Sequence, residues 1–395
     1  MIKAHQIRLN PTPEQETHFY KAAGTARYTY NWAVGQWHER AKVNPSGNVL
    51  KKDFNRIKPE WVFEVCKSVR DGAFMDFDKA VANYKSDRAK KPTFKSKNHG
   101  NFSFYVANDR IEVAGHGIKL RKLGWVNMVE KLRFHGKILN ARIRKIGNHW
   151  YVSITVELTD KEVEPKQEAC GVDVGILRLV TMSDGITVDN LRPLKTNLHR
   201  LAQLQRVLAG KQKGSKNYEK VKFKIREVHD RIRCIRDDLL HKLTTFIAKQ
   251  YGLVAVEDLN VKGMTKNHRL AQSLQDASLG RLIRLLNYKV VDRHGKFVKV
   301  DRFFPSSKTC SCCGQINQQL TLRDRVYRCY SCNIEIDRDL NAAINILYEG
   351  LRIIFGNTMS GSGYDGHKKP PKTGNNLNLS SVLVGGVQVC IHSYT

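Results

Sequence analysis

The chain has 395 residues, and its 67 Lys and Arg against 37 Asp and Glu give a formal net charge of +30. This length exceeds a typical single domain, so two or more domains are expected, and the surplus charge calls for a polyanionic partner. No apolar run reaches the roughly 18 residues of a membrane span, and the first ten residues lack the apolar region of a signal peptide. The composition therefore favours a cytoplasmic nucleic-acid-binding protein with no membrane partner.

The N-terminal part is predicted to be one strand followed by helices. Residues 2–9 alternate as a strand does, and Thr12 with Pro13 is typical of a helix start. Residues 12–84 are mostly helical in pattern, with Phe74, Phe77 and Val81 on one apolar face. Aromatic rings alternate with polar and basic side chains early in this region and could stack on bases, although packing of the helices explains most such rings equally well. The candidates for nucleic-acid contact here are Arg27, Tyr28, Tyr30, Asn31 and Trp32.

A basic linker and a strand-rich region follow. Residues 79–100 contain seven Lys or Arg and one Asp, with no apolar periodicity, and Lys95 and Lys97 are further candidates for nucleic-acid contact. Short strands separated by Gly-containing turns then run through residues 101–158. Their spacing predicts a small antiparallel barrel.

An acidic residue interrupts the apolar strand that follows this region. Asp173 lies in the run Cys170-Gly-Val-Asp-Val-Gly, flanked by Gly171 and Gly175. A buried carboxylate costs several kcal/mol unless a partner compensates it, and the glycines allow another backbone or a ligand to approach closely. A carboxylate that caps a loop at the strand end is the alternative.

Acidic residues occur in settings similar to that of Asp173 at two later places in the chain. Glu257 ends the apolar run from Leu253, and Asp337 and Asp339 open a helical segment. Carboxylates at the ends of separate elements suit Mg²⁺, which prefers oxygen ligands and retains water, and two such ions roughly 4 Å apart can promote phosphodiester hydrolysis. Only one of Asp337 and Asp339 need be a ligand, since the other can cap the helix.

A helical hairpin is predicted between the first two acidic strands. Apolar residues recur at near-heptad spacing on both arms, which meet at the turn at residues 210–216. Between Arg200 and Arg236 twelve basic residues face three acidic ones. Solubility is the ordinary reason for a charged face, and the imbalance makes phosphate binding an equal alternative. The strands and helices that alternate with this hairpin predict an α/β sheet.

The cysteines predict a zinc ribbon. Five of the nine lie between Cys310 and Cys332, which disfavours a disulfide framework. Two C-x-x-C pairs, separated by fifteen residues, give the tetrahedral ligand set of one structural Zn²⁺: Cys310, Cys313, Cys329 and Cys332. Cys312 is a bystander, and Asn333 takes the left-handed turn position where Gly is commoner. Arg323 and Arg325 could neutralise a scissile phosphate, with solvent exposure as the alternative.

These motifs together resemble the TnpB proteins of bacterial and archaeal insertion sequences. The resemblance rests on the segments beginning at Gly171, Val256, Pro305 and Asp337, and extends to the N-terminus through Thr25, Pro92 and Leu123; only the tail lies outside it. Lys308 and Asn333 depart from the family's usual Gln and Gly. The resemblance implies a RuvC-type, RNase H-like nuclease related to the type V CRISPR effectors, with Asp339 as the third catalytic carboxylate beside Asp173 and Glu257.

The resemblance also implies a multidomain α+β and α/β architecture. Its expected parts are a wedge β-barrel (1–11 and 96–162), a helical recognition insertion (12–95), a RuvC-like nuclease domain (165–305 and 334–356) and a zinc ribbon (306–333). The composition of residues 357–395, rich in Gly, Ser, Asn, Lys and Pro, separately predicts a disordered tail.

The function it implies is an RNA-guided, Mg²⁺-dependent endonuclease that recognises a short target-adjacent motif and cleaves double-stranded DNA. The expected partners are a guide RNA from the element's own locus and target DNA, bound by a monomer associated with the nucleoid. The alternatives are a nuclease-inactive RNA-guided repressor, which an intact triad disfavours, and a directly acting DNA transposase, which uses the same metals.

Overall fold

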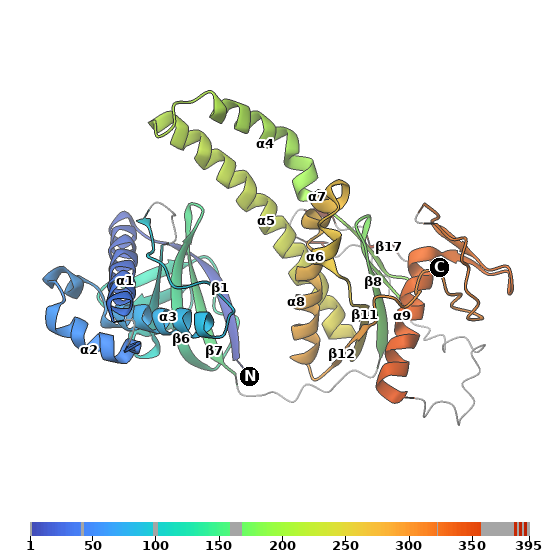
Figure 1. Ribbon diagram of the computed structural model, residues 1–395, viewed down its shortest axis with the longest axis horizontal. Helices are drawn as coiled ribbons and strands as arrows, with labels where there is room; N and C mark the ends of the chain where they lie inside the picture. Colours follow the sequence, from blue (N-terminus) through green and yellow to red (C-terminus); the bar gives the residue numbers. More distant parts are fainter. Residues whose placement is uncertain are drawn as a thin grey trace. The chain divides into compact units, whose positions relative to one another are not determined.

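The computed structural model describes residues 2–40, 43–97, 102–158, 168–321 and 323–356, together with 383–384, 387–388 and 391–392. The chain divides into two compact units, Met1–Lys161 and Glu162–Thr395 (Figure 1). No helix among these residues combines the length and apolar content that a membrane crossing requires. The finer division into five domains stays a prediction.

The first unit combines one antiparallel sheet with a group of helices. Its elements are β1 (Ile2–Asn10), α1 (Pro13–Glu39), α2 (Gly47–Ile57), η1 (Glu60–Glu64), α3 (Lys67–Lys85), β2 (Ser103–Ala107), η3 (Asn108–Arg110), β3 (Ile111–Ala114), β4 (Gly117–Leu120), β5 (Gly124–Met128), β6 (Lys137–Ile146) and β7 (His149–Glu157). The strand order is β2-β6-β7-β1-β5-β4-β3. The described residues contain no pairing between the end strands β2 and β3, so the predicted closed barrel is not confirmed.

The helices of the first unit begin and end largely as the sequence predicts. Thr12 is the N-cap of α1, where it forms a capping box with Gln15, and Pro13 follows at the first position. The basic linker starts later than its charge pattern indicated, because α3 continues to Lys85 and Val81 packs in the helical core. A bidentate pair between Arg142 and Asp76, at 2.8 and 2.9 Å, joins β6 to α3.

The second unit is a mixed sheet with helices on both faces. Its elements are β8 (Ala169–Val174), β9 (Arg178–Met182), β10 (Thr187–Asp189), α4 (Pro193–Ala209), α5 (Lys216–Gln250), β11 (Leu253–Glu257), α6 (Val261–Met264), α7 (His268–Ala277), α8 (Leu279–Val291), β12 (Lys296–Val300), β13 (Val326–Arg328), β14 (Glu335–Asp337), α9 (Arg338–Phe355), β15 (Leu383–Val384), β16 (Val387–Gln388) and β17 (Ile391–His392). The sheet order is β12-β11-β8-β9-β10-β17. Most of the tail lies outside the described residues, so its predicted disorder stays a prediction.

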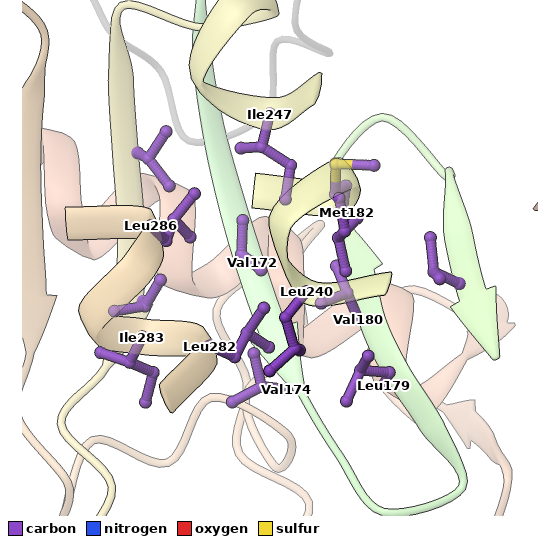
Figure 2. Packing of buried hydrophobic residues seen from close by; sticks show 14 of the residues in the cluster. Val172, Val174, Leu179, Val180, Met182, Leu240, Ile247, Leu282, Ile283 and Leu286 are labelled. Atoms are coloured by element: carbon purple, nitrogen blue, oxygen red, sulfur yellow. The ribbon is translucent and has the colours of Figure 1, made fainter. Parts of the chain in front are cut away.

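Strand direction changes at β8. The strand β11 runs parallel to both β8 and β12, whereas β9 runs antiparallel to β8 and β10. On one face, α5, α7 and α8 cover a core that includes Val172, Leu240 and Leu282 (Figure 2). On the other face lies α9 (Figure 1), and its Ile346 packs against β11 and β12. The sheet is therefore covered on both sides, as its nearly continuous apolar strands require.

The long helix α5 has two packing partners. Its first half packs on α4, where Leu201 meets Val228 and Ile232. Its second half, from Leu239 to Ala248, packs on the sheet. The predicted hairpin is confirmed, with the arms ending and beginning at Ala209 and Lys216, and its tip lies away from the sheet (Figure 1).

Small residues allow α9 to lie directly on the sheet. A Cβ atom added at Gly171 would lie 2.1 Å from the carbonyl oxygen of Ala343, and one added at Gly350 would lie 2.4 Å from Cβ of Ala255. These distances are far below van der Waals contact. The close approach predicted for Gly171 is thus made by the backbone of α9.

We expect Gly171→Ala to destabilise the protein by about 1–3 kcal/mol or more, because the added methyl group meets backbone and not a flexible side chain. Thermal unfolding of the purified variant would measure the loss. Gly280→Ala is the matched control, since Gly280 in α8 has no atom within 4 Å of an added Cβ. That substitution should leave stability unchanged or raise it by up to about 1 kcal/mol; equal melting temperatures for the two variants would contradict the close packing of α9.

Candidate functional site

Strand alternation places Asp173 and Glu257 on the same face of the sheet. Their predecessors Val172 and Val256 are register partners and point into the core beneath α5 and α8. Successive side chains on a strand point to opposite faces, so the two carboxylates lie on the α9 face at the ends of adjacent parallel strands. The alternation of side chains could be predicted from the sequence, but the pairing of β8 with β11 could not.

Asp339 completes a cluster of three carboxylates. It lies in the first turn of α9, and its side chain is 17% exposed. Burial, followed by the charges of Glu257 and Asp339, raises the pKa of Asp173 to about 8, while Arg338 opposes this shift. A buried carboxyl group whose ionisation is opposed further by neighbouring carboxylates is a place where a cation would be stabilised. The charges of both other predicted ligands therefore act on Asp173. Among the described residues only the four cysteines place their ligand atoms within 4.8 Å of one another, so a magnesium site at these carboxylates stays a prediction.

The neighbouring Asp337 has a structural role. Its Oδ1 accepts hydrogen bonds from the backbone N–H groups of Asp339 and Leu340 at 3.0 and 3.1 Å, which makes it the N-cap of α9. Its Oδ2 pairs with Nη1 of Arg178 at 2.7 Å. The Asp339 carboxylate lies farther from this guanidinium, at 3.9 Å. The geometry thus separates a capping aspartate from a candidate ligand.

Ser306 holds the second carboxylate. Its hydroxyl donates a hydrogen bond to Oε1 of Glu257. Burial raises the pKa of Glu257, and this hydrogen bond partly offsets the rise. Sequence reasoning included Ser306 only as part of a motif and missed this contact, as it missed Arg178. The available signal for Ser306 was its position soon after the strand β12, which lies beside β11.

The four predicted zinc ligands form a compact thiol cluster. The Sγ atoms of Cys310, Cys313, Cys329 and Cys332 lie within 4.8 Å of one another. Two pairs are closer, with Cys310 and Cys332 at 3.6 Å and Cys313 and Cys329 at 3.5 Å. A tetrahedral zinc ion with Zn–S bonds of about 2.3 Å needs sulfur atoms about 3.8 Å apart. The cluster could therefore hold such an ion, with no ligand position left open.

The turns that present these thiols match their sequence. Gly314 and Asn333 follow the two C-x-x-C pairs with φ angles of 76° and 56°, and their N–H groups donate to the carbonyls of Cys310 and Cys329 at 2.9 Å. The left-handed position predicted for Asn333 is confirmed. Cys312 is exposed.

Two buried amide side chains fasten the ribbon to α9. Asn341 accepts from the N–H of Ser311 at 2.9 Å and donates to the carbonyl of Thr309 at 2.7 Å. Asn345, one turn later, donates to the carbonyls of Ser306 and Thr309 at 2.8 and 2.6 Å. Because Asp339 lies on the same helix, the fold of the ribbon and the position of this carboxylate are linked. The i, i+4 spacing of two Asn residues was the sequence signal, and sequence analysis did not use it.

The aromatic candidates in the first unit pack mostly inward. Tyr30 is 5% exposed, and Trp32 packs against the core formed by α1, α2 and α3. Tyr28 is partly exposed and contacts Trp61, with ring centroids 5.0 Å apart. Arg27 is half-buried. Packing of the helices, the alternative to base stacking, therefore accounts for Tyr30 and Trp32.

Two of the polar candidates in the first unit, Asn31 and Lys95, connect α1 to the segment that follows α3. Asn31 and the backbone of Lys95 exchange hydrogen bonds at 2.7 and 3.0 Å. The ammonium group of Lys95 lies 3.6 Å from the centroid of the Tyr30 ring. Lys97, like Arg323 and Arg325 of the ribbon, is exposed. No observation assigns these residues to nucleic acid, and that role stays a prediction.

The fold resembles that of a protein whose structure was solved in complex with RNA and DNA. The chain superposes on the protein of a solved Cas12f1–sgRNA–target DNA complex with a TM-score of 0.56 and 14% identity, over 88% of this chain and 98% of the other. Residues 153–268 match a family model described as a probable transposase, residues 280–346 a Cas12f1-like TNB domain and residues 1–44 a helix-turn-helix domain. In this structure the last of these segments contains one strand and one long helix.

Curated relatives match nearly the whole length of the chain. "Putative RNA-guided DNA endonuclease" of Streptomyces pristinaespiralis is 31% identical over 363 residues, which cover 88% of this chain and 89% of the relative. "Putative RNA-guided DNA endonuclease InsQ" of Escherichia coli is 28% identical over 385 residues, which cover 92% and 96%. The chain belongs to the TnpB family.

Proposed function

We propose that this protein is an RNA-guided, Mg²⁺-dependent endonuclease that recognises a short target-adjacent motif and cleaves double-stranded DNA. The observation that carries the proposal is Asp173, which shares a face of the sheet with Glu257 and whose pKa is raised first by burial and then by the charges of Glu257 and Asp339. The full-length similarity to relatives named as RNA-guided DNA endonucleases supports the same activity. Their names supply the guide RNA and the DNA as partners.

Each carboxylate has a role in this proposal. Asp173, Glu257 and Asp339 would hold Mg²⁺, which supplies charge stabilisation and an activated water for phosphodiester hydrolysis. Ser306 orients Glu257, and Asp337 orients the first turn of α9. Arg178 and Arg338 place positive charge beside Asp339, at 3.9 and 3.4 Å, where they can also oppose the charge of a phosphate.

The zinc ribbon would support this site without taking part in the chemistry. Four thiolates leave no open position on Zn²⁺, so the ion would be structural. The bonds from Asn341 and Asn345 to the ribbon segment fix the start of α9.

The decisive experiment is to purify the chain from cells that contain its own genetic locus, and to sequence any RNA that purifies with it. A discrete RNA, together with cleavage of plasmid DNA that needs this RNA, a matching target and Mg²⁺, would support the proposal. Strand transfer without RNA would identify a directly acting transposase. Target binding by the RNA complex with no cleavage would identify a repressor.

We expect the affinity for nucleic acid to fall steeply with salt. The charge of +30 and the basic stretches at residues 79–97 and 200–236 provide many sites for phosphate contact, and each contact on duplex DNA contributes about −0.9 to the slope of log K against log salt concentration. Equilibrium binding at several potassium chloride concentrations measures this slope. A nearly flat response would count against both stretches as phosphate-binding surfaces.

A further inference from the structure

The start of α3 carries a buried arginine, Arg70, whose hydrogen-bonding capacity is not fully used in the described residues. Arg70 is 8% exposed, and its Nη1 atom is buried without a hydrogen-bond acceptor. No carboxylate of the described part of the chain forms an ion pair with it. The adjacent carboxylate, Asp71, is paired with Lys51 at 2.7 Å. The charge of Asp71 also acts on Arg70 and partly offsets its burial, but Asp71 is shared with Lys51. A buried cation with incomplete compensation and an unsatisfied nitrogen is costly to the folded state, so an anion from outside the chain would complete the compensation.

Two further cations, Lys58 and Lys67, lie near Arg70. Lys58 and Arg70 both lie against the ring of Phe63, with the ammonium 5.0 Å and the guanidinium carbon 5.4 Å from its centroid. The pKa of Lys58 lies below its ordinary value because of partial burial and because of the charges of Arg70 and Lys67. The ring offsets part of the repulsion between the cations but supplies no negative charge.

The helix itself adds to the positive potential. The N-cap of α3 is Cys66, which makes no capping hydrogen bond through its side chain, and the first turn contains no acidic residue. Helix N-termini carry a partial positive charge and usually attract acidic side chains. Here Lys67 and Arg70 occupy the first turn instead. An N-terminus of this composition is suited to an anion from outside the helix.

Exposed aromatic rings beside this point indicate the kind of anion. Phe63 is 51% exposed and Trp61 is 44% exposed, both on η1 immediately before α3. Exposed rings beside basic side chains are typical of surfaces that bind nucleic-acid strands, since bases or sugars can pack on them. A free phosphate ion would leave the exposed parts of both rings in water.

We propose that Lys58, Lys67 and Arg70 bind a backbone phosphate of a nucleic-acid strand, with Trp61 and Phe63 contacting the adjoining nucleotide. These three cations form the α3 phosphate site. The proposal rests on the proposed function for nucleic acid as the partner, and it adds a contact that does not depend on cleavage.

A matched pair of substitutions on one helix tests the site. Lys67→Gln removes a charge at the start of α3, and Lys85→Gln removes an exposed charge at its end. Binding of the purified RNA complex to labelled target DNA, and of the RNA-free chain to a labelled RNA, is measured over a range of salt concentrations without added Mg²⁺. For one of these two ligands, Lys67→Gln should reduce the magnitude of the salt slope by about 0.7–0.9, while Lys85→Gln leaves it unchanged. Equal slopes for the two variants with both ligands would overturn the proposal.

The stability of the nucleic-acid-free chain gives an independent readout. If Arg70 binds a phosphate, Arg70→Met should raise the melting temperature in phosphate-free buffer and weaken nucleic-acid binding. If Arg70 is a packing residue only, Arg70→Met should lower the melting temperature and leave binding unchanged, and the proposal fails. Inorganic phosphate that stabilises the wild-type chain, with no effect of Lys67→Gln on nucleic-acid binding, would indicate a site for free phosphate and would also reject it. Failure of the proposed function is distinguished by the absence of RNA-dependent cleavage in the wild-type protein, which these variants do not measure.

Discussion

Replacement of Asp173, Glu257 or Asp339 by Ala should abolish DNA cleavage while binding of RNA and target DNA persists. In the proposed function the three carboxylates hold the same metal ions, so the loss of one ligand would remove the function of the others. Double substitutions should therefore be no worse than single ones. Cleavage of a radiolabelled duplex, with binding measured on the same preparations, separates the two properties.

Asp337 provides the control for this set. Because it caps α9 and pairs with Arg178, Asp337→Ala should retain cleavage at a reduced rate, with loss of about 0.5–2 kcal/mol in stability. Normal cleavage by Asp339→Ala, combined with complete loss in Asp337→Ala, would reverse the assignment of ligand and cap.

Loss of a zinc ligand should disable the nuclease although zinc performs no chemistry. Cys329→Ser or Cys332→Ser should remove stoichiometric zinc and reduce cleavage severely, while guide-RNA binding remains. Metal binding supplies roughly 10–16 kcal/mol of folding free energy in isolated zinc modules, and Cys332 lies seven residues before Asp339. The amide bonds of Asn341 and Asn345 to the ribbon segment give the physical route by which unfolding there would displace α9.

Metal analysis and cleavage rates of the purified variants test this coupling. Cys312→Ser is the matched control, because this thiol is exposed and lies outside the cluster of four; it should keep both zinc and activity. A Cys332→Ser variant that lacks zinc and cleaves at the normal rate would show that the ribbon and the active site are independent.

The features that were predictable from the sequence are those with a local signal. The cap at Thr12, the hairpin between Ala209 and Lys216, and the left-handed turn at Asn333 each follow from side chains a few residues apart. The thiol cluster was predictable because the geometry of C-x-x-C pairs is short-range.

The remaining features depend on contacts between distant segments. Pairing of β8 with β11 decides which residue faces Asp173, and sequence alternation alone does not specify the partner strand. The contacts of Ser306 with Glu257 and of Arg178 with Asp337 connect residues 49 and 159 positions apart. The choice between Tyr30 as a base-stacking residue and as a core residue likewise depended on burial, which α2 and α3 supply.

The two halves of α5 pack on different partners, so the length of the α4–α5 hairpin can change independently of the sheet that carries Asp173. Its sheet-bound half begins at Leu239 and belongs to the core under Asp173, whereas the half that precedes it packs only with α4 in the apolar clusters of the described residues. Each added or deleted helical turn changes the length of such an arm by about 5.4 Å. Insertions matched in α4 and the first half of α5 would therefore lengthen the arm without disturbing the sheet, and evolution could adjust the span of this arm while the carboxylate cluster stayed in place.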